Sequence, residues 1–311
     1  MSDIGPLVCI VGPTASGKSA VADRIAQRVS GEVVSVDAMQ VYKGMDIGTA
    51  KTPPEERLCT LHMVDICPIN ANYSVERFQT DARSCIDGLL AGGICPILCG
   101  GTGLYLNAVI DEMDFPSGFR GDSRREAYEE LARSEGPQRL HEMLRERDPE
   151  SADEIHPNNT RRVIRALEMC DEGKSYAASL RTLHARAQHY RASIYGLELP
   201  REELYRRIDR RVDDMFDKGL VEEVQKLVSA GLSSDTTAGQ AIGYKEILEA
   251  LSGSCSMDDA REAIKTNTRR YAKRQISWFR HDARVKWIDM QGETADSAAE
   301  HVISEVFDAA F

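Results

Sequence analysis

The chain has 311 residues, 42% of them apolar and 29% charged, which excludes both a small disulfide-stapled scaffold and a mostly disordered chain. Its 39 lysine and arginine residues against 50 aspartate and glutamate residues give a net charge of −11, which argues against a nucleic-acid partner unless the cations are clustered. No apolar stretch is long enough to span a bilayer and the first residues lack the basic segment of a signal peptide, so we expect a cytoplasmic protein with no membrane partner.

The first predicted strand, residues 7–11, is followed by a glycine-rich loop and by a helix over residues 20–29. A Gly-x-x-x-x-Gly-Lys-Ser motif in this strand-to-helix context predicts a site for a diphosphate or triphosphate, although a chance match in a turn is the alternative. Backbone amides and the Lys18 ammonium would bind phosphate oxygens, and the Ser19 hydroxyl would bind Mg²⁺. The predicted phosphate-binding residues are Gly12, Pro13, Thr14, Ala15, Ser16, Gly17, Lys18 and Ser19.

Two more strands are predicted at residues 33–36 and 94–99, with residues 74–90 forming the helix that connects them. The second strand is apolar throughout, as in a parallel sheet covered on both faces. It ends without the acidic residue that an ordinary P-loop kinase or hydrolase uses to hold its metal. Asp37 instead follows the 33–36 strand, at the edge of the sheet where ligands bind. These patterns predict an α/β fold with a P-loop NTPase-like parallel sheet flanked by helices.

The middle of the chain has a different pattern. Residues 115–118 contain a proline and a glycine that break the preceding element, and residues 122–154 are charged and helical without strand patterns. A strand at 192–199 and one long helix at 201–228 then resume the core pattern. We therefore expect a catalytic core from residues 1–112 and 191–311, interrupted by a mainly helical insertion over residues 113–190.

Positive charge is clustered near the end of the chain despite the acidic balance. Between residues 265 and 286 there are eight basic residues and one acid, with Tyr271, Trp278 and Phe279 among them. Such a segment is typical of an RNA surface with aromatic groups available for stacking. The alternative is an amphipathic helix with core aromatics and solvated cations. A smaller cluster contains Arg161, Arg162 and Arg165.

At these motifs the sequence resembles the tRNA dimethylallyltransferase family. The matching motifs occur in the family's order over nearly the whole chain. The chain is similar to the compact bacterial members of the family, which lack a zinc finger. One departure is Ala38, where the family commonly has serine. The matching blocks are residues 12–19, 35–42, 46–51, 100–105, 156–159, 241–246 and 271–280.

The resemblance implies transfer of a dimethylallyl group from dimethylallyl diphosphate to N6 of adenosine 37, in tRNAs that read codons beginning with U. Asp37 would accept the N6 proton, and Thr102 would bind near the bridging oxygen. Lys18, Mg²⁺ and Arg211 would neutralise the diphosphate. From the residues alone, Asp37 and Thr102 could instead cap a turn and a helix, and a neighbouring arginine could take the place of Arg211.

The resemblance also implies a partner, the tRNA anticodon stem-loop, whose adenine would be flipped into a channel that reaches the phosphate loop. The helical insertion would clasp the stem, and we expect the protein to act as a monomer. The implied tRNA contacts are Asp37, Ala38, Met39, Gln40, Thr102, Arg125, Arg161, Arg162, Arg165, Gln240, Gly243, Tyr244, Lys245, Lys273, Arg274, Gln275, Trp278 and Arg280.

Three other functions stay open from the sequence. A small-molecule kinase would keep the phosphate loop, but the missing strand-terminal acid and the basic C-terminal segment count against it. A non-catalytic RNA-binding module would not need Lys18, Ser19, Asp37 and Thr102 together. A prenyltransferase for free nucleotides would share the early motifs but would not need the late basic surface.

Overall fold

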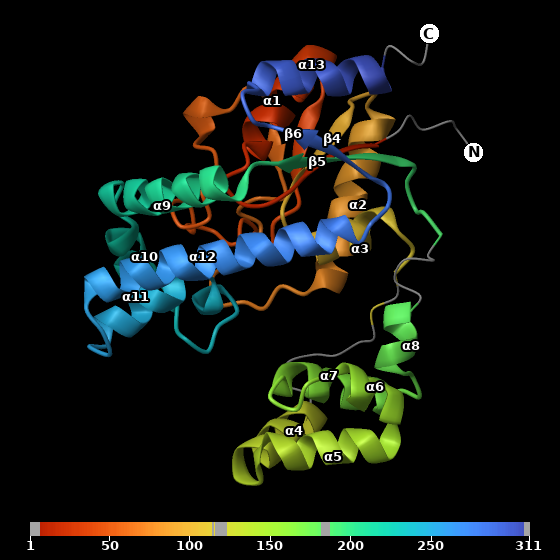
Figure 1. Ribbon diagram of the computed structural model, residues 1–311, viewed down its shortest axis with the longest axis vertical. Coiled ribbons are helices and arrows are strands. Elements are labelled where there is room, and N and C mark those ends of the chain that lie inside the picture. The colour runs from red at the N-terminus through yellow and green to blue at the C-terminus, as the bar shows by residue number, and fades with distance from the viewer. Residues whose placement is uncertain (1–6, 114, 116–122, 182–186, 308–311) are drawn as a thin grey trace. The chain divides into compact units, whose positions relative to one another are not determined.

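The computed structural model describes residues 7–113, 115, 123–181 and 187–307. They fall into two compact units, one from Met1–Asp111 with Gln188–Phe311 and one from Glu112–Ala187 (Figure 1). Asp111 and Gln188 form an isolated antiparallel bridge, so the chain leaves the larger unit and returns to it at adjacent positions. The shorter unit is thus an insertion in the sequence of the larger one, and its two connections to the larger unit are adjacent.

The larger unit is built on a six-stranded, all-parallel sheet with the order β3-β2-β4-β1-β5-β6. The predicted parallel α/β fold is confirmed. Two strands escaped prediction, β3 because it has only two residues and β6 because its first residues overlap the basic C-terminal segment. The strands are β1 (Leu7–Val11), β2 (Glu32–Ser35), β3 (Leu61–His62), β4 (Pro96–Gly100), β5 (Ala192–Glu198) and β6 (Val285–Asp289).

Helices cover both faces of the sheet because its strands alternate apolar side chains between two cores. Val8 and Ile10 pack with helices α1 and α13, whereas Cys9 and Val11 pack with α2 and α3 on the other face. The helices of this unit are α1 (Lys18–Val29), α2 (Val75–Ala91), α3 (Gly103–Ile110), α9 (Arg201–Asp217), α10 (Leu220–Ser229), α11 (Tyr244–Leu251), α12 (Met257–Arg280) and α13 (Ala295–Val306), with 3₁₀ turns at Pro54–Glu56 and Ala238–Gln240.

The predicted single helix over residues 201–228 is wrong. Gly219 has a left-handed φ of 92° and separates α9 from α10, since a residue in that conformation cannot continue a right-handed helix. The break lets α10 take a different direction from α9 and pack against α11. As a result, α9 lines the cavity described below, whereas α10 lies outside its lining.

The inserted unit is helical, with its own small core. Leu140, Leu144, Val163, Ile164 and Leu167 are buried together there. The predicted helical pattern over 122–154 contains three helices in the described residues, and most of the predicted chain break at 115–118 lies outside them. The helices are α4 (Ser123–Ser134), α5 (Gly136–Arg147), α6 (Pro149–Glu154), α7 (Thr160–Asp171) and α8 (Tyr176–Arg181).

Candidate active site

The glycine-rich loop between β1 and α1 is shaped for an anion. Gly12 has φ 135°, and a Cβ there would lie 2.6 Å from the Leu197 carbonyl oxygen, so only glycine fits. The Lys18 ammonium donates to the Pro13 carbonyl at 2.6 Å and forms no ion pair with any described residue. Burial lowers the pKa of Lys18 to about 8, although nearby Cys99 and Asp37 act in the opposite direction. The loop therefore holds a desolvated cation that has no ion pair among the described residues.

Arg211 supplies a second cation to the same site. It is the only arginine of the Arg206–Arg211 run that lines the cavity, whereas Arg206 and Arg207 are exposed and pair with Glu203. Burial lowers the pKa of Arg211, and the Asp37 carboxylate partly offsets that effect. Among the described residues Arg211 has no ion-pair partner. Since Arg211 also lowers the pKa of Lys18, the two cations repel each other until an anion lies between them.

Oxygen donors suitable for a divalent metal line the same cavity. Ser19 lies at its wall, and Asp23 follows one helical turn later on α1. Burial raises the pKa of Asp23. The described residues contain no group of three or more histidine, cysteine, aspartate or glutamate side chains that could hold a metal alone. A few oxygen donors beside a phosphate loop fit Mg²⁺, which is commonly held by one or two protein ligands, substrate phosphates and water.

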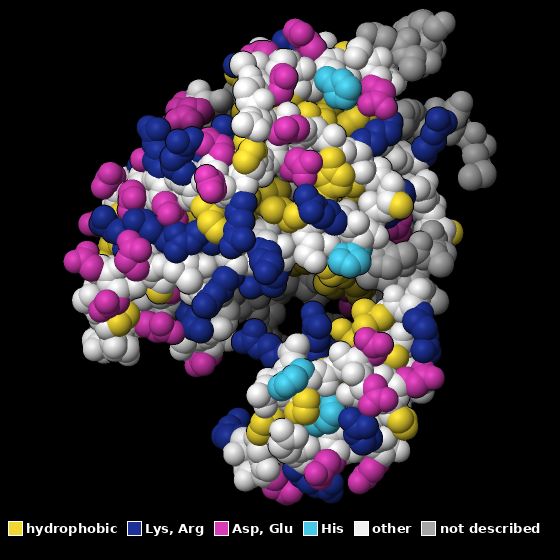
Figure 2. Space-filling model, viewed as in Figure 1, with side chains coloured by type: hydrophobic (Ala, Val, Ile, Leu, Met, Phe, Trp, Pro, Cys, Tyr) yellow, Lys and Arg dark blue, Asp and Glu magenta, His cyan; other side chains and the backbone are white. Residues whose placement is uncertain are grey.

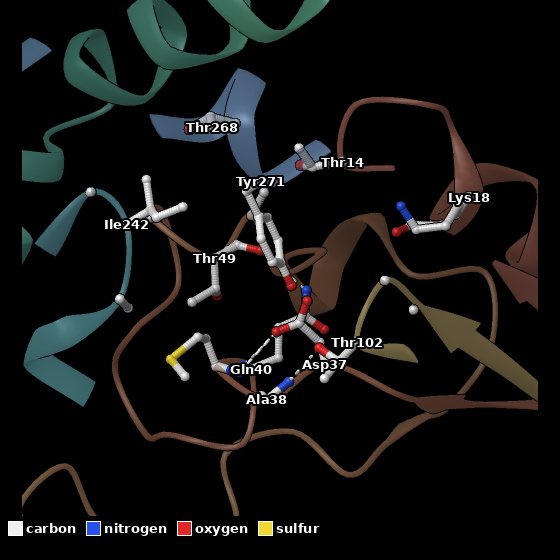
Figure 3. A pocket seen from close by; sticks show the side chains of 18 of the residues that line it. Thr14, Lys18, Asp37, Ala38, Gln40, Thr49, Thr102, Ile242, Thr268 and Tyr271 are labelled. Carbon is white, nitrogen blue, oxygen red and sulfur yellow. Dashed lines mark hydrogen bonds between the residues drawn. The ribbon is translucent and has the colours of Figure 1, made fainter. Parts of the chain in front are cut away.

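Asp37 ends the segment after β2 and makes a tight turn. Its Oδ1 accepts from the backbone amides of Met39 at 2.8 Å and Gln40 at 3.3 Å, so the alternative role as a turn cap is real. Both bonds use Oδ1, and no described residue donates to Oδ2. Because Asp37 lines the cavity, one carboxylate oxygen holds the turn while the other remains for a ligand (Figure 3).

Thr102 lies beside Asp37 and joins two strand ends. Its side chain makes no capping bond to α3; its Oγ1 instead accepts from the Ala38 amide at 3.2 Å. The Tyr271 ring points toward Asp37 and Thr102 from α12 (Figure 3). Burial raises the Tyr271 pKa to about 12, so the phenol stays protonated at neutral pH. The two strand ends and α12 thus converge on one point.

These groups share one cavity of about 380 Å³. Lys18 and Ser19 lie on its wall together with Asp37 and Thr102, so the cavity connects the phosphate loop to the Asp37 turn. An apolar wall is formed by Ile208, Val212, Met215 and Ile264. Sequence reasoning missed this wall. Its signal is the spacing of Ile208, Val212 and Met215, which places all three on one face of α9.

Gln275 and Trp278 fasten α12 to the loops of the site. The Gln275 amide accepts from the Thr14 amide and donates to the Gly101 carbonyl, both at 2.9 Å. Trp278 donates from its indole nitrogen to Asn107 at 3.1 Å and is 37% exposed. The Gln275 side chain is therefore occupied by the protein itself, whereas Trp278 still offers part of its ring to solvent.

The basic segment over 265–286 is largely neutralised in the folded chain. Its cations are interleaved with acidic side chains over α9 and α12 (Figure 2). Only Arg270, Lys273 and Arg274 are exposed without an ion pair among the described residues, and Arg274 also lines the cavity. The pairs are Lys265 with Asp213 and Glu262, Arg269 with Asp209, Arg280 with Glu198, Arg284 with Asp111 and Asp282, and Lys286 with Glu305.

The segment before α11 lines the cavity through Gln240 and Gly243, together with the residues between them. Tyr244 is fully buried, and its hydroxyl donates to Glu223 at 2.6 Å. Its side chain is therefore out of reach of an RNA. Lys245 is exposed and lies 3.8 Å from Glu249.

The arginines predicted to contact tRNA in the inserted unit are of two kinds, those with an ion pair and those without one among the described residues. Arg125 pairs with Glu129 and Glu168, and Arg165 pairs with Glu168. Arg161 and Arg162 are exposed in the first turn of α7 and have no ion pair among the described residues. These two are the cations of the cluster that remain free for an anionic partner.

Comparison with known proteins identifies the family. A family model described as IPP transferase matches residues 40–282, and one described as isopentenyl transferase matches residues 6–66. The chain belongs to the IPP transferase family. It is 45% identical over 301 residues to the tRNA dimethylallyltransferase of Carboxydothermus hydrogenoformans, covering 96% of each chain. It is 46% identical over 286 residues to that of Geobacillus thermodenitrificans, covering 91% of this chain and 90% of the relative.

Solved structures agree with this membership and confirm the predicted family. The full-length tRNA isopentenylpyrophosphate transferase from Bacillus halodurans is 42% identical, with a TM-score of 0.72 and coverage of 97% of this chain and 95% of that one. A eukaryotic dimethylallyltransferase acting on tRNA is 30% identical, with a TM-score of 0.79 and coverage of 98% and 80%. None of the helices in the described residues has the length and apolar character needed to cross a membrane.

Proposed function

We propose that this chain transfers the dimethylallyl group of dimethylallyl diphosphate to N6 of adenosine 37 in tRNAs that read codons beginning with U. The products are N6-(dimethylallyl)adenosine and diphosphate. The observation that carries the proposal is that one cavity joins two cations without an ion pair among the described residues, Lys18 and Arg211, to the carboxylate of Asp37. That arrangement suits a substrate pair in which one partner leaves as an anion and the other loses a proton.

The diphosphate binds at the glycine-rich loop. As the C1–O bond breaks, its electron pair goes to the diphosphate oxygen, and the growing negative charge is stabilised by Lys18 and Arg211. Thr102 lies near this position and can hydrogen-bond the bridging oxygen. When bound through Ser19, Mg²⁺ would neutralise phosphate charge. The apolar wall formed by Ile208, Val212, Met215 and Ile264 suits the prenyl chain and excludes water from C1.

Asp37 acts on the other substrate. The adenine amine is a poor nucleophile because its lone pair is delocalised into the ring, so a positioned base contributes on the order of 10²- to 10⁴-fold. The N6–C1 bond forms as the N6 proton passes to Oδ2, while Oδ1 keeps the turn in place. The adenine reaches this carboxylate only if it leaves the anticodon-loop stack.

The tRNA contacts that the exposed cations support best are Lys273 and Arg274 on α12 and Arg161 and Arg162 on α7. Ala38, Met39, Gln40, Gln240 and Gly243 line the cavity and contact the flipped nucleotide. Trp278 contributes its exposed edge, and Lys245 and Arg280 are further exposed cations of the larger unit that would contact the RNA. Tyr244 is left out because its side chain is buried. We also propose that the enzyme acts as a monomer.

Incubation of the protein with Mg²⁺, labelled dimethylallyl diphosphate and either unmodified tRNA or AMP tests the function. We expect label in tRNA alone, recovered as N6-(dimethylallyl)adenosine at position 37, and no label in a tRNA with guanosine there. Label in AMP would favour a free-nucleotide prenyltransferase. Label in neither acceptor would refute prenyl transfer.

A further inference from the structure

The loop after Tyr42 forms one wall of the cavity through Gly48, Thr49 and Ala50. It is closed at its base by Lys51, whose buried ammonium donates to the Tyr42 carbonyl at 2.7 Å and pairs with Asp46 at 2.8 Å and Asp65 at 2.5 Å. Lys51 therefore fixes the Asp46 side chain, whereas the backbone amides of residues 46–48 are bound by another element.

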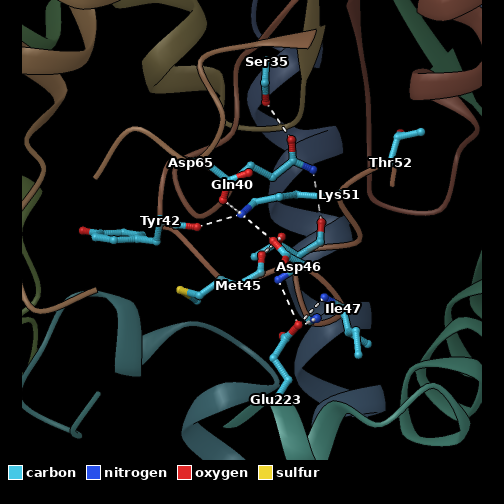
Figure 4. A network of polar contacts seen from close by, with 12 residues as sticks. Ser35, Gln40, Tyr42, Met45, Asp46, Ile47, Lys51, Thr52, Asp65 and Glu223 are labelled. Atoms are coloured by element: carbon cyan, nitrogen blue, oxygen red, sulfur yellow. Dashed lines mark hydrogen bonds and ion pairs between the residues drawn. The ribbon is translucent and has the colours of Figure 1, made fainter. Parts of the chain in front are cut away.

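Glu223 on α10 binds these amides. Its Oε2 accepts from the backbone amides of Asp46 at 3.0 Å and Ile47 at 2.7 Å (Figure 4). Its Oε1 accepts from the Gly48 amide at 3.3 Å and from the Tyr244 hydroxyl at 2.6 Å. A single carboxylate thus binds three consecutive backbone donors, which are charge-assisted bonds stronger than neutral ones.

The loop also lies directly against the Tyr244 ring. A Cβ at Gly48 would come within 2.5 Å of that ring, so the backbone can approach only because the residue is glycine. Tyr244 is itself fixed, since it is fully buried and bonded to Glu223. Glu223 and Tyr244 together determine where the loop lies at the cavity wall.

A chain of hydrogen bonds connects this loop to the proposed base. The Thr49 carbonyl accepts from the Gln40 amide at 3.2 Å, and the other end of that amide accepts from Ser35 at 2.7 Å. The Gln40 backbone amide donates to Asp37 Oδ1 at 3.3 Å. A shift of the loop would therefore move both Gln40 and the turn that orients the Asp37 carboxylate.

We propose that Glu223 is a positioning residue for the acceptor purine: it holds residues 46–49 so that the purine is placed against Asp37. This inference rests on the proposed function. Glu223 acts through the backbone of the loop and touches neither substrate, because it does not line the cavity. The donor side, built on the phosphate loop and Arg211, has no bond to this network in the described residues.

The test compares steady-state kinetics of Glu223→Ala with those of Glu222→Ala, an exposed neighbour on the same helix. Because a misplaced reacting group costs up to about 10²-fold, we expect kcat/KM for tRNA to fall about 10- to 100-fold in Glu223→Ala, with KM for dimethylallyl diphosphate unchanged. Glu222→Ala should match the wild type. A general loss of structure would instead impair both substrates together.

Glu223→Gln separates positioning from charge. Its amide oxygen can still accept from Asp46 and Ile47, and its amide nitrogen can donate to the Tyr244 hydroxyl. Only the longest of the four bonds, that from the Gly48 amide at 3.3 Å, is lost, so we expect most activity to return. If Glu223→Ala fails to fold, Gly48→Ala decides, because it pushes the same loop off the Tyr244 ring and should give the same selective loss toward tRNA. Wild-type kinetics in Glu223→Ala or in Gly48→Ala would overturn the inference, and so would equal losses of kcat/KM for tRNA and for dimethylallyl diphosphate. If the wild-type enzyme labels no tRNA, the proposed function fails instead.

Discussion

Lys18 and Arg211 are desolvated cations that line the same cavity and have no ion pair among the described residues. Burying a charge without a partner is unfavourable, so the free protein keeps this arrangement at a cost to its stability. A diphosphate relieves both the desolvation and the mutual repulsion. The affinity of the site therefore comes from side chains that the other described residues leave without an ion pair.

The lowered pKa of Lys18 predicts a pH-dependent affinity for inorganic diphosphate. Above a pKa of about 8 the free protein loses the ammonium proton, whereas the bound anion favours the charged form. Binding must then take up a proton, so we expect the dissociation constant to rise about tenfold for each pH unit above 8, up to the higher pKa of the complex.

Calorimetry between pH 7 and 10 measures this dependence. Lys18→Met provides the control, because it should bind weakly and lack the additional dependence once the ionisation of diphosphate itself is subtracted. Identical pH profiles for the wild type and Lys18→Met would contradict the assignment of the titrating group.

Sequence reasoning predicted those cavity-lining residues that belong to a recognisable motif. It predicted Asp37 from its place after a strand, and the structure adds that the same side chain caps the turn. It did not find Glu223, because a glutamate on an amphipathic helix has no signature until the loop that it binds is placed. It included Tyr244 because it lies in a matching motif, and burial is invisible in a motif.

At the scale of elements, α12 carries two different faces. Its inward face presents Ile264, Thr268, Tyr271 and Gln275 to the cavity, and its outward face presents Arg270 and Lys273 to solvent. The sequence predicted the positive charge of this segment correctly, but it could not show which of the cations are free of ion pairs and thus able to bind an RNA. The neutralising acids Asp209 and Asp213 lie on α9, and Glu305 lies on α13, more than a dozen residues away in each case.

The pairing pattern predicts which cations respond to salt. Each phosphate contact contributes about 0.7 to 0.9 to the slope of log affinity against log salt. Replacing Lys273 and Arg274 with glutamine should therefore reduce the slope for tRNA by about 1.5. Lys265→Gln serves as the control, since Lys265 is already paired with Asp213 and Glu262 and should leave the slope unchanged. The assignment of this surface fails if the double variant keeps the wild-type slope or if Lys265→Gln lowers it.

Over the whole molecule, the sequence predicted the parallel sheet and its flanking helices, because strand, loop and helix signals are local, and it predicted the family through the resemblance of its motifs. It could not predict the break at Gly219, since glycine is tolerated inside helices and only its left-handed φ shows the end of α9. Strands as short as β3 carry too little pattern to detect. The distribution of ion pairs depends on tertiary contacts and is likewise absent from the sequence.

The inserted unit offers a test of its proposed contact with tRNA in the intact protein. Arg161→Gln with Arg162→Gln removes two exposed, unpaired cations, so tRNA affinity should fall about tenfold or more while diphosphate affinity and thermal stability stay unchanged. Arg145→Gln is a matched control, because Arg145 is exposed but paired with Asp153. Filter binding and thermal melting measure both effects. Equal tRNA affinities in the two variants would exclude the α7 cations from the RNA surface.

The central claim is that one cavity holds a departing diphosphate while Asp37 takes a proton from the purine. Asp37→Asn tests it most directly, since asparagine keeps an Oδ1 acceptor for the Met39 amide but is not a base at neutral pH. In single-turnover reactions with saturating substrates, we expect the variant to transfer label about 10²- to 10⁴-fold more slowly while binding tRNA and diphosphate as tightly as the wild type. A wild-type transfer rate in Asp37→Asn would contradict the account.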